Sequence, residues 1–518
     1  EIVLDIAQEA DPERRAALAK IADPLTRDQG LRELALYAET ADDWRQVGEL
    51  ASPWNVSLAV QAYETAIRLG SDQFWDRISL ARLYVTADQL SNAQTALTGI
   101  SPDGLTLREQ IILASELGKI AQTQGHIDAA RGHFETSPSK ASSALDDQPD
   151  DSEAIQSLLT AHILMGDFAR SQQDMVSAQN HYETALNVAT SLIDTHPDSD
   201  AILRDKSVIY DGLADLAASR QDIDSARDYF EKSLAIAITL AEKYPANWGL
   251  QRDVSVSFEK MGNVARVQER LEDAKRWYDK AYDIRKDIYD SDTSNLRSKR
   301  DLAVILEKLG RVDAAEGNIQ EALASYDRSL ALRQALVAEQ PTNSTAKIDL
   351  AIMYNAAGDM TLDASSELSD DNISEAETLR LKAIDLYTAG LGINTDLRSA
   401  APDDARVENS LIASFNRLGE AYHSLGETGK ASQHYQSALA LSEIRAERSP
   451  ESSSAQINLA IAYANLAFLG DEDELSYWRE ADTVFQAVAD RSELTRGYMA
   501  MWDEIKTNIA RLEMEAPD

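Results

Sequence analysis

The chain has 518 residues, 44% of them hydrophobic and 27% charged, so it is long enough for several domains or a repeat array and too hydrophobic to be disordered. Its 50 basic and 88 acidic residues give a net charge of -38, which argues against nucleic-acid and anionic-membrane binding and allows cationic partners. Cysteine is absent, which excludes disulfides and thiolate metal sites, and no apolar stretch is long enough to span a bilayer. The same negative charge would also serve simply to keep a large helical surface soluble.

Residues 1–40 contain short helical phrases and lack the motif that repeats through the rest of the chain. We interpret them as an N-terminal helical cap or a link to something upstream. Because the chain starts with Glu1 rather than Met, we interpret it as a fragment or a processed product, with any targeting or anchoring segment upstream.

From residue 41 a triplet recurs, in which an alanine is followed by an aromatic residue four positions on and by a small residue three further on. Residues three and four apart share one face of a helix, so each triplet predicts one buried helix face. Seven regular members are Ala130/Phe134/Ser137, Ala178/Tyr182/Ala185, Ala226/Phe230/Ser233, Ala274/Tyr278/Ala281, Ala322/Tyr326/Ser329, Ala383/Tyr387/Gly390 and Ala431/Tyr435/Ala438. Their aromatic residues are separated by 48, 48, 48, 48, 61 and 48 positions.

Three further markers keep the 48-residue period. They are a small residue 16 positions before most of the aromatics (Gly118, Gly166, Ala214, Gly262, Gly310, Gly419), a set of prolines (149, 197, 245, 341, 402, 450) and a set of aspartates (Asp205, Asp253, Asp301, Asp349). A fixed period over hundreds of residues is typical of a solenoid. We predict two helices per unit: a first helix with a small central residue where a neighbour approaches closely, and a second helix that carries the triplet and ends before proline.

The segment FNRLGEAYHSLGETGKASQHYQSA, from Phe415 to Ala438, resembles the tetratricopeptide repeat. Phe415 occupies the tryptophan position of that family's pattern, and the matching residues are Leu418, Gly419, Tyr422, Ala431, Tyr435 and Ala438. The resemblance extends over residues 41 to 490. It implies an all-α fold, a right-handed superhelical α-solenoid of about ten helix pairs with capping helices at its ends.

The 48-residue period exceeds the family's usual 34 residues. The spacings between the aromatic, proline and glycine markers place about seven extra residues in each helix. Seven residues are close to two turns, so the buried face stays in phase. We therefore predict a long-helix variant, similar to the long-period arrays of bacterial multidomain proteins that often accompany a signalling or effector domain.

These patterns divide the chain into a cap or linker (1–40), shorter-period repeats (41–103), long-period repeats (104–490) and a C-terminal capping helix with a tail (491–518). The single step of 61 places an insertion at residues 360–377. The insertion is rich in acidic residues and has no lysine or arginine. We expect a solvated loop or a helix extension there, with a docking loop as the alternative.

No catalytic set emerges from the sequence. The histidines are scattered, and His126 and His133 have no metalloprotease motif around them. Carboxylates are so numerous that pairs four apart are inevitable and do not indicate acid–base catalysis. We expect no catalytic residues, no cofactor and no metal ion, hence a non-enzymatic protein.

In the tetratricopeptide family the first helices line a concave groove, and ligands meet the residues three before and one after the central glycine. The resemblance therefore implies these partner-binding candidates: Asp167, Asp211, Asp215, Glu259, Asn263, Glu307, Arg311, Asn355, Asp359, Asn416 and Glu420. No lysine occurs among them, so the carboxylate clamp known in the family is not expected. A cationic or hydrogen-bonding segment fits better, with a merely solvated acidic wall as the alternative.

We predict a protein–protein interaction scaffold that binds a protein or peptide segment on the concave face. The alternatives are a regulatory or sensor arm of an effector domain that precedes residue 1, and a structural protein that self-associates into homo-oligomers. Nucleic acid and direct membrane insertion are not expected. We expect a cytoplasmic location, with a periplasmic or extracellular one as the alternative.

Overall fold

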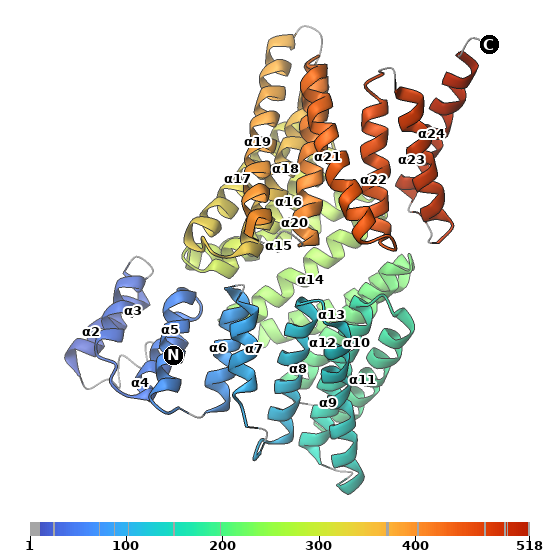
Figure 1. Ribbon diagram of the computed structural model, residues 1–518. Helices are drawn as coiled ribbons and strands as arrows, with labels where there is room; N and C mark the ends of the chain where they lie inside the picture. Colours follow the sequence, from blue (N-terminus) through green and yellow to red (C-terminus); the bar gives the residue numbers. More distant parts are fainter. Residues whose placement is uncertain are drawn as a thin grey trace. The chain divides into compact units, whose positions relative to one another are not determined.

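The computed structural model describes residues 11–515 except 24–25, 72, 88, 102, 149–150, 197, 369–371, 401–403, 471–472, 492–493 and 495. Within these residues the chain is all α-helical and contains no strand (Figure 1). It divides into two compact units, residues 1–316 and 317–518.

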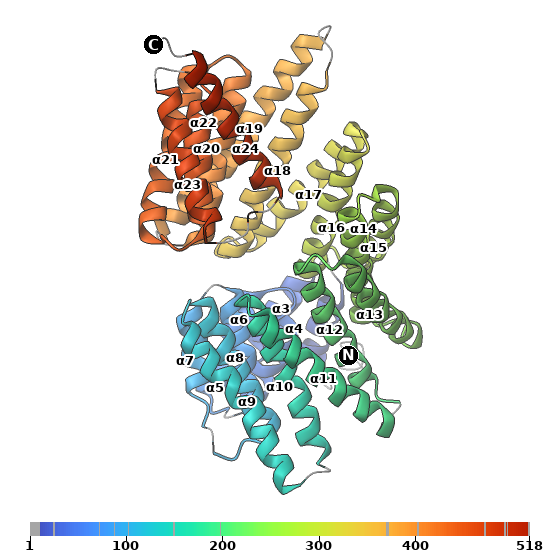
Figure 2. The same cartoon turned by 90° about the vertical axis from the view of Figure 1, so that its right-hand side faces the viewer.

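In the first unit, consecutive helices pack side by side, as two perpendicular views show (Figure 1, Figure 2). Its helices are α2 (Pro12–Ala22), α3 (Arg27–Leu36), α4 (Ala41–Ala51), α5 (Val56–Arg68), α6 (Phe74–Thr86), α7 (Leu90–Thr98), α8 (Leu107–Thr123), α9 (Ile127–Asp147), α10 (Ser152–Ser171), α11 (Met175–Thr195), α12 (Asp200–Ser219), α13 (Ile223–Lys243), α14 (Trp248–Val267), α15 (Leu271–Ser291) and α16 (Leu296–Ala315).

The second unit has the same kind of neighbour packing. Its helices are α17 (Ile319–Glu339), α18 (Ser344–Ser366), α19 (Ile373–Ala400), α20 (Ala405–Ser424), α21 (Thr428–Arg448), α22 (Ser453–Ala467), α23 (Glu474–Ala489) and α24 (Arg496–Glu515). The all-α helical-repeat solenoid predicted from the period is thereby confirmed.

Helix length follows the predicted long period. The first helices α10, α12, α14, α16 and α20 each have 20 residues, and the second helices α9, α11, α13, α15, α17 and α21 each have 21. Pro245, Pro341 and Pro450 lie two residues beyond the ends of α13, α17 and α21, as expected of a residue that stops a helix. The other three periodic prolines, at 149, 197 and 402, lie outside the described residues.

The repeated triplet is core, because its aromatic ring lies on the small central residue of the first helix. Tyr182 and Tyr278 are fully buried, and a Cβ added to Gly166 would lie 2.6 Å from the ring of Tyr182. Equivalent close approaches occur at Gly118 with Phe134, Gly262 with Tyr278, Gly358 with Tyr387 and Gly419 with Tyr435. The central glycine therefore makes room for the aromatic side chain of its own helix pair.

The turns inside the helix pairs share one backbone feature that the sequence motif did not reveal. Several of these turns contain a residue with a positive φ, among them Gly125, Gln173, Gln221, Glu269, Gly317 and Gly426. Five of these six follow one another at 48-residue intervals, so the left-handed residue belongs to the repeat. Three of the six are not glycine, although glycine adopts this conformation without strain.

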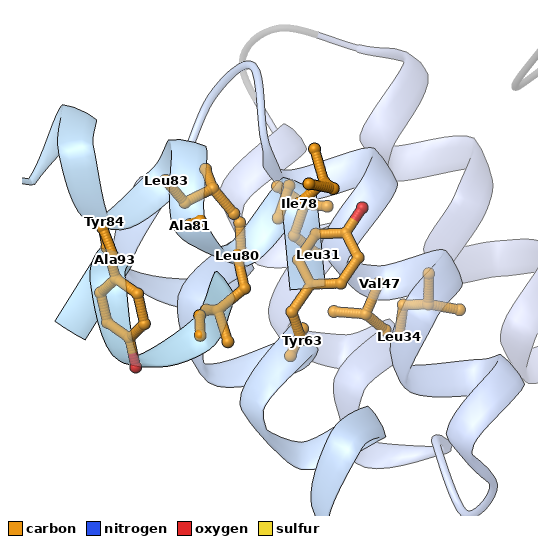
Figure 3. Packing of buried hydrophobic residues seen from close by; sticks show 14 of the residues in the cluster. Leu31, Leu34, Val47, Tyr63, Ile78, Leu80, Ala81, Leu83, Tyr84 and Ala93 are labelled. Atoms are coloured by element: carbon orange, nitrogen blue, oxygen red, sulfur yellow. The ribbon is translucent and has the colours of Figure 1, made fainter. Parts of the chain in front are cut away.

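The described part of the N-terminal region is packed into the first unit. Leu31 and Leu34 of α3 share one hydrophobic cluster with Val47, Tyr63 and Ile78 (Figure 3). Helices α2 and α3 thus add a further helix pair to the end of the stack.

The predicted insertion at 360–377 lengthens two helices. Helix α18 has 23 residues and α19 has 28, and Met360, Leu362 and Ala376 are buried. Residues 360–366 and 373–377 are therefore helical, whereas residues 369–371 lie outside the described residues.

The C-terminal helix α24 covers the last helix pair. Ile505 is buried in a cluster with Trp478 and Phe485, and the Trp502 indole donates a hydrogen bond of 2.7 Å to Asp482.

A candidate binding groove on the first helices

The residue one position after the central small residue has an internal role in several repeats. The Tyr182 hydroxyl donates to Asp167 at 2.6 Å, the Tyr278 hydroxyl to Asn263 at 2.9 Å, and the Tyr387 hydroxyl to Asp359 at 2.8 Å. A buried hydroxyl requires such an acceptor. Burial, together with the nearby carboxylate, raises the pKa of both Tyr182 and Tyr387.

Other acidic candidates in the first unit are held by cations of the same chain. Lys260 contacts Asp215 at 2.7 Å, Arg285 contacts Glu259 at 2.6 Å, and Arg311 contacts Glu307 at 2.6 Å. Much of the predicted acidic wall is therefore neutralised from within.

The candidates of the second unit are not brought together into one open patch. Asn355 is only 5% exposed and bonds to Ser414 at 3.1 Å, so it lies in the core. The amide oxygen of Asn416 is buried without a partner. Asp359 also accepts from Arg417 at 2.6 Å, and Glu420 is exposed.

A cavity of about 260 Å³ lies between α12, α13 and α14 and contains one of the predicted residues, Asp211. We call it the α12–α14 pocket. Its lining combines apolar side chains, three aspartates and two arginines, and consists of Arg204, Asp205, Ser207, Val208, Asp211, Ala237, Leu240, Leu250, Arg252, Asp253, Val256 and Ser257.

Two carboxylates of the pocket are poorly neutralised. Burial raises the pKa of Asp211 to about 6, although Ser233 and Lys260 act in the opposite direction, and its Oδ1 atom has no hydrogen-bond partner. Burial likewise raises the pKa of Asp205 against the attraction of Arg204. At both carboxyls the cost of burying the charge outweighs the attraction of the nearby cation.

The remaining charges form a ladder between neighbouring first helices. Arg204 of α12 contacts Asp253 of α14 at 2.8 Å, and Arg252 of α14 donates to Asp301 of α16 at 3.0 Å. These pairs join residues 49 positions apart, so the same contact recurs between successive repeats of the first unit.

The candidates predicted from the sequence were polar positions, so they did not include a row of apolar side chains on the same face of these helices. Val208, Val256 and Val304 lie at 48-residue intervals on α12, α14 and α16, and Val208 is 45% exposed. The period itself was the signal that could have found them, because branched aliphatic residues recur six positions before the central small residue. Ile352 occupies the same register in the second unit and is 48% exposed.

The described residues contain no cluster of three or more histidine, aspartate or glutamate side chains that could hold a metal ion. Across the same residues, no helix has the length and apolarity needed to cross a bilayer.

Consecutive helix pairs with a constant register define an α-helical repeat protein. Two family models described as tetratricopeptide repeat match residues 157–239 and 412–444. The chain is a tetratricopeptide-repeat protein, and such repeats suggest a protein–protein interaction scaffold in a generally non-enzymatic family.

Solved structures with similar folds include BtubC from P. vanneervenii, which is 20% identical, with 54% of this chain and 92% of that chain covered and a TM-score of 0.33. Yeast Tom70 is 13% identical, with 97% and 96% covered and a TM-score of 0.33. A Rap protein complexed with competence and sporulation factor is 13% identical, with 81% and 99% covered and a TM-score of 0.38. No curated protein matches the chain.

Proposed function

We propose that the chain is a non-enzymatic scaffold that holds an extended partner segment against the first helices α12, α14 and α16. The observation that carries this proposal is the row of exposed or partly exposed valines, Val208, Val256 and Val304, which recurs beside acidic side chains at a 48-residue interval. A segment with apolar and cationic side chains would complement this face.

The shape of the surface supports an elongated ligand. A second cavity of about 260 Å³, lined by Asp200, Ala201, Arg204, Leu240, Tyr244, Asn247 and Leu250, adjoins the α12–α14 pocket. The two cavities share Arg204, Leu240 and Leu250. We expect several consecutive residues of a partner segment to fit across these two adjoining cavities.

Peptide selection on the purified chain tests this proposal. Peptides enriched from a random display library would be measured for affinity to the wild type and to the variants Val208→Lys and Val256→Lys. We expect each variant to bind at least about tenfold more weakly, since the introduced ammonium would compete with the cationic side chains of the ligand for the carboxylates of this face. The matched control is Val176→Lys on α11, whose valine is 70% exposed. Equal affinity for all four proteins would refute the assignment of the binding face.

Reversing the charge of Asp215, Glu259 or Glu307 is a poor test, because each carboxylate is bonded to a cation of the same chain. Loss of binding after such a change would report altered packing as readily as lost contact. We also propose a cytoplasmic location, which fractionation of cells that express the tagged chain would check.

A further inference from the structure

In the repeat after the α12–α14 pocket, an arginine of the chain itself occupies the equivalent position. Arg285 of α15 is 3% exposed, and its guanidinium makes three contacts. It donates to the carboxylate of Glu259 at 2.6 Å, to the hydroxyl of Ser255 at 3.2 Å and to the backbone carbonyl of Asp301 at 3.1 Å. A carboxylate, a hydroxyl and a carbonyl in three directions match the planar fork of a guanidinium.

Three acceptors of the same kinds stand one repeat earlier, without the arginine, although an aspartate replaces the glutamate and the Ser207 hydroxyl also bonds to that of Ser233 at 2.8 Å. Subtracting 48 from each position converts Glu259, Ser255 and Asp301 into Asp211, Ser207 and Asp253, all of which line the α12–α14 pocket. Position 285 becomes Ala237, which also lines the pocket. The repeat therefore keeps the receptor for a guanidinium and omits the side chain that would occupy it.

The repeats on either side show that this combination is specific. Forty-eight positions after Arg285 stands Arg333, which is 8% exposed and donates to the carbonyl of Asp349 at 3.4 Å, so a second arginine uses the same register. Forty-eight positions before Ala237 stands Ala189. The residues in the places of Ser207 and Asp211 are there Leu159 and Ile163, both buried, so apolar side chains replace the polar acceptors.

We propose that the α12–α14 pocket receives an arginine side chain of a partner protein, in the place that Arg285 takes in the next repeat. The inference rests on the proposed function and names one residue that the bound segment must carry. The guanidinium would lie against Asp211 and Ser207, with the apolar stem along Val208 and Leu240. A lysine ammonium, a compact charge without the planar fork, would satisfy these acceptors less well.

The probe is N-acetyl-arginine methylamide, titrated against protein labelled at its valine and leucine methyl groups and followed by NMR. The isosteric citrulline derivative serves as the uncharged control. We expect the arginine probe to shift the methyl signals of Val208, Leu240 and Val256, with an affinity at least about tenfold above that of the citrulline probe. Absence of these shifts, or equal affinity of the two probes, would overturn the proposal.

Two variants locate the site. Ala237→Arg should fill the pocket from within and abolish probe binding, as Arg285 fills its own pocket. Its control is Ala235→Arg, which adds the same charge on an exposed position of α13 and should bind the probe like the wild type. Asp211→Asn, which keeps the shape, should also weaken binding by about tenfold or more. Unchanged binding to both Ala237→Arg and Asp211→Asn would refute the site.

A further arm separates a protein ligand from a small metabolite. Free L-arginine carries a carboxylate that the acidic pocket disfavours, so we expect it to bind more weakly than the blocked probe. Tighter binding of free arginine would overturn the assignment to a partner protein. If selected peptides lose affinity with Val208→Lys while the arginine probe fails to bind, the scaffold proposal survives and the arginine subsite is wrong.

Discussion

The ring of Tyr182 lies between two glycines, Gly166 of its own helix pair and Gly212 of the next. A Cβ added to either glycine would lie 2.6 Å from the ring. Gly166→Ala should therefore force the ring or the helix to move and should lower the free energy of unfolding by about 1–3 kcal/mol, as overpacked core substitutions do. Urea denaturation followed by far-UV circular dichroism measures this change.

The control for this substitution is Gly132→Ala on α9, where an added Cβ has nothing within 4 Å. At an exposed helical position, alanine should stabilise the protein by up to about 1 kcal/mol relative to glycine. If both substitutions changed stability in the same direction, close packing would not be the reason for glycine at position 166.

A second prediction concerns the left-handed turns. Gln221 and Glu269 have φ values of 62° and 59°, which cost a side-chain-bearing residue free energy. Gln221→Gly and Glu269→Gly should each stabilise the protein by roughly 0.5–1 kcal/mol, after the greater freedom of glycine in the unfolded chain is subtracted. The converse change, Gly125→Ala at a φ of 78°, should destabilise it by a similar amount. Thermal unfolding of the three variants would decide the matter, and a lower melting temperature for both glycine variants would contradict it.

The period of the sequence predicted the helices because each marker reflects a steric requirement. Tyr278 needs a small residue opposite it, and proline at 245 cannot continue a helix, so both requirements can be recognised from the sequence alone. The left-handed conformation of Gln221 was not predictable, because polar residues in a turn do not by themselves reveal the sign of φ. The structure shows it, and it places Gln221 at the same turn position as Gly125 and Gly317 in other repeats.

A third prediction concerns Arg27, which joins α3 to the turn between α15 and α16. Its guanidinium contacts Asp292 at 2.6 Å and lies 4.0 Å from the centre of the Trp54 ring, and the residue is 7% exposed. Arg27→Met should leave a largely buried aspartate without its cation and destabilise this contact by about 2–4 kcal/mol. Hydrogen exchange should then accelerate in α2, in α3 and around residue 292.

The matched control is Arg32→Met on the same helix. Arg32 pairs with Asp28, but both side chains are more than half exposed, at 68% and 59%. An exposed ion pair contributes little to the free energy of unfolding, so this variant should change hydrogen exchange only within α3 itself. Faster exchange around residue 292 in Arg32→Met as well would show that the effect does not depend on the Arg27 contact.

The sequence predicted which positions share the candidate face, but not which of their carboxylates are neutralised by a cation of the same chain. Counting from the central small residue, Ala214 or Gly262, found Asp211 and Glu259 on the same face. It did not show that Arg285 neutralises Glu259, because that cation comes from another helix, 26 positions along the chain. The distinction between the two repeats depends on Ala237 in place of arginine, a difference in the second helix that a reading of the first helices alone does not include.

The last prediction follows from the pKa of Asp211, which burial raises to about 6. An unfolded aspartate titrates near 4, so between about pH 4 and 6 the folded protein binds more protons than the unfolded chain. Stability attributable to this residue therefore falls as pH rises through that window and stays reduced above it. Asp211→Asn lacks the ionisation, so it should be about 3 kcal/mol more stable than the wild type at pH 7.5 and equally stable below pH 4. Urea titrations at several pH values measure the difference. If the stability difference between the two proteins were constant across this range, ionisation of Asp211 would not be its cause. If the arginine probe reduced the difference at pH 7.5, a guanidinium would be shown to stabilise the ionised carboxylate.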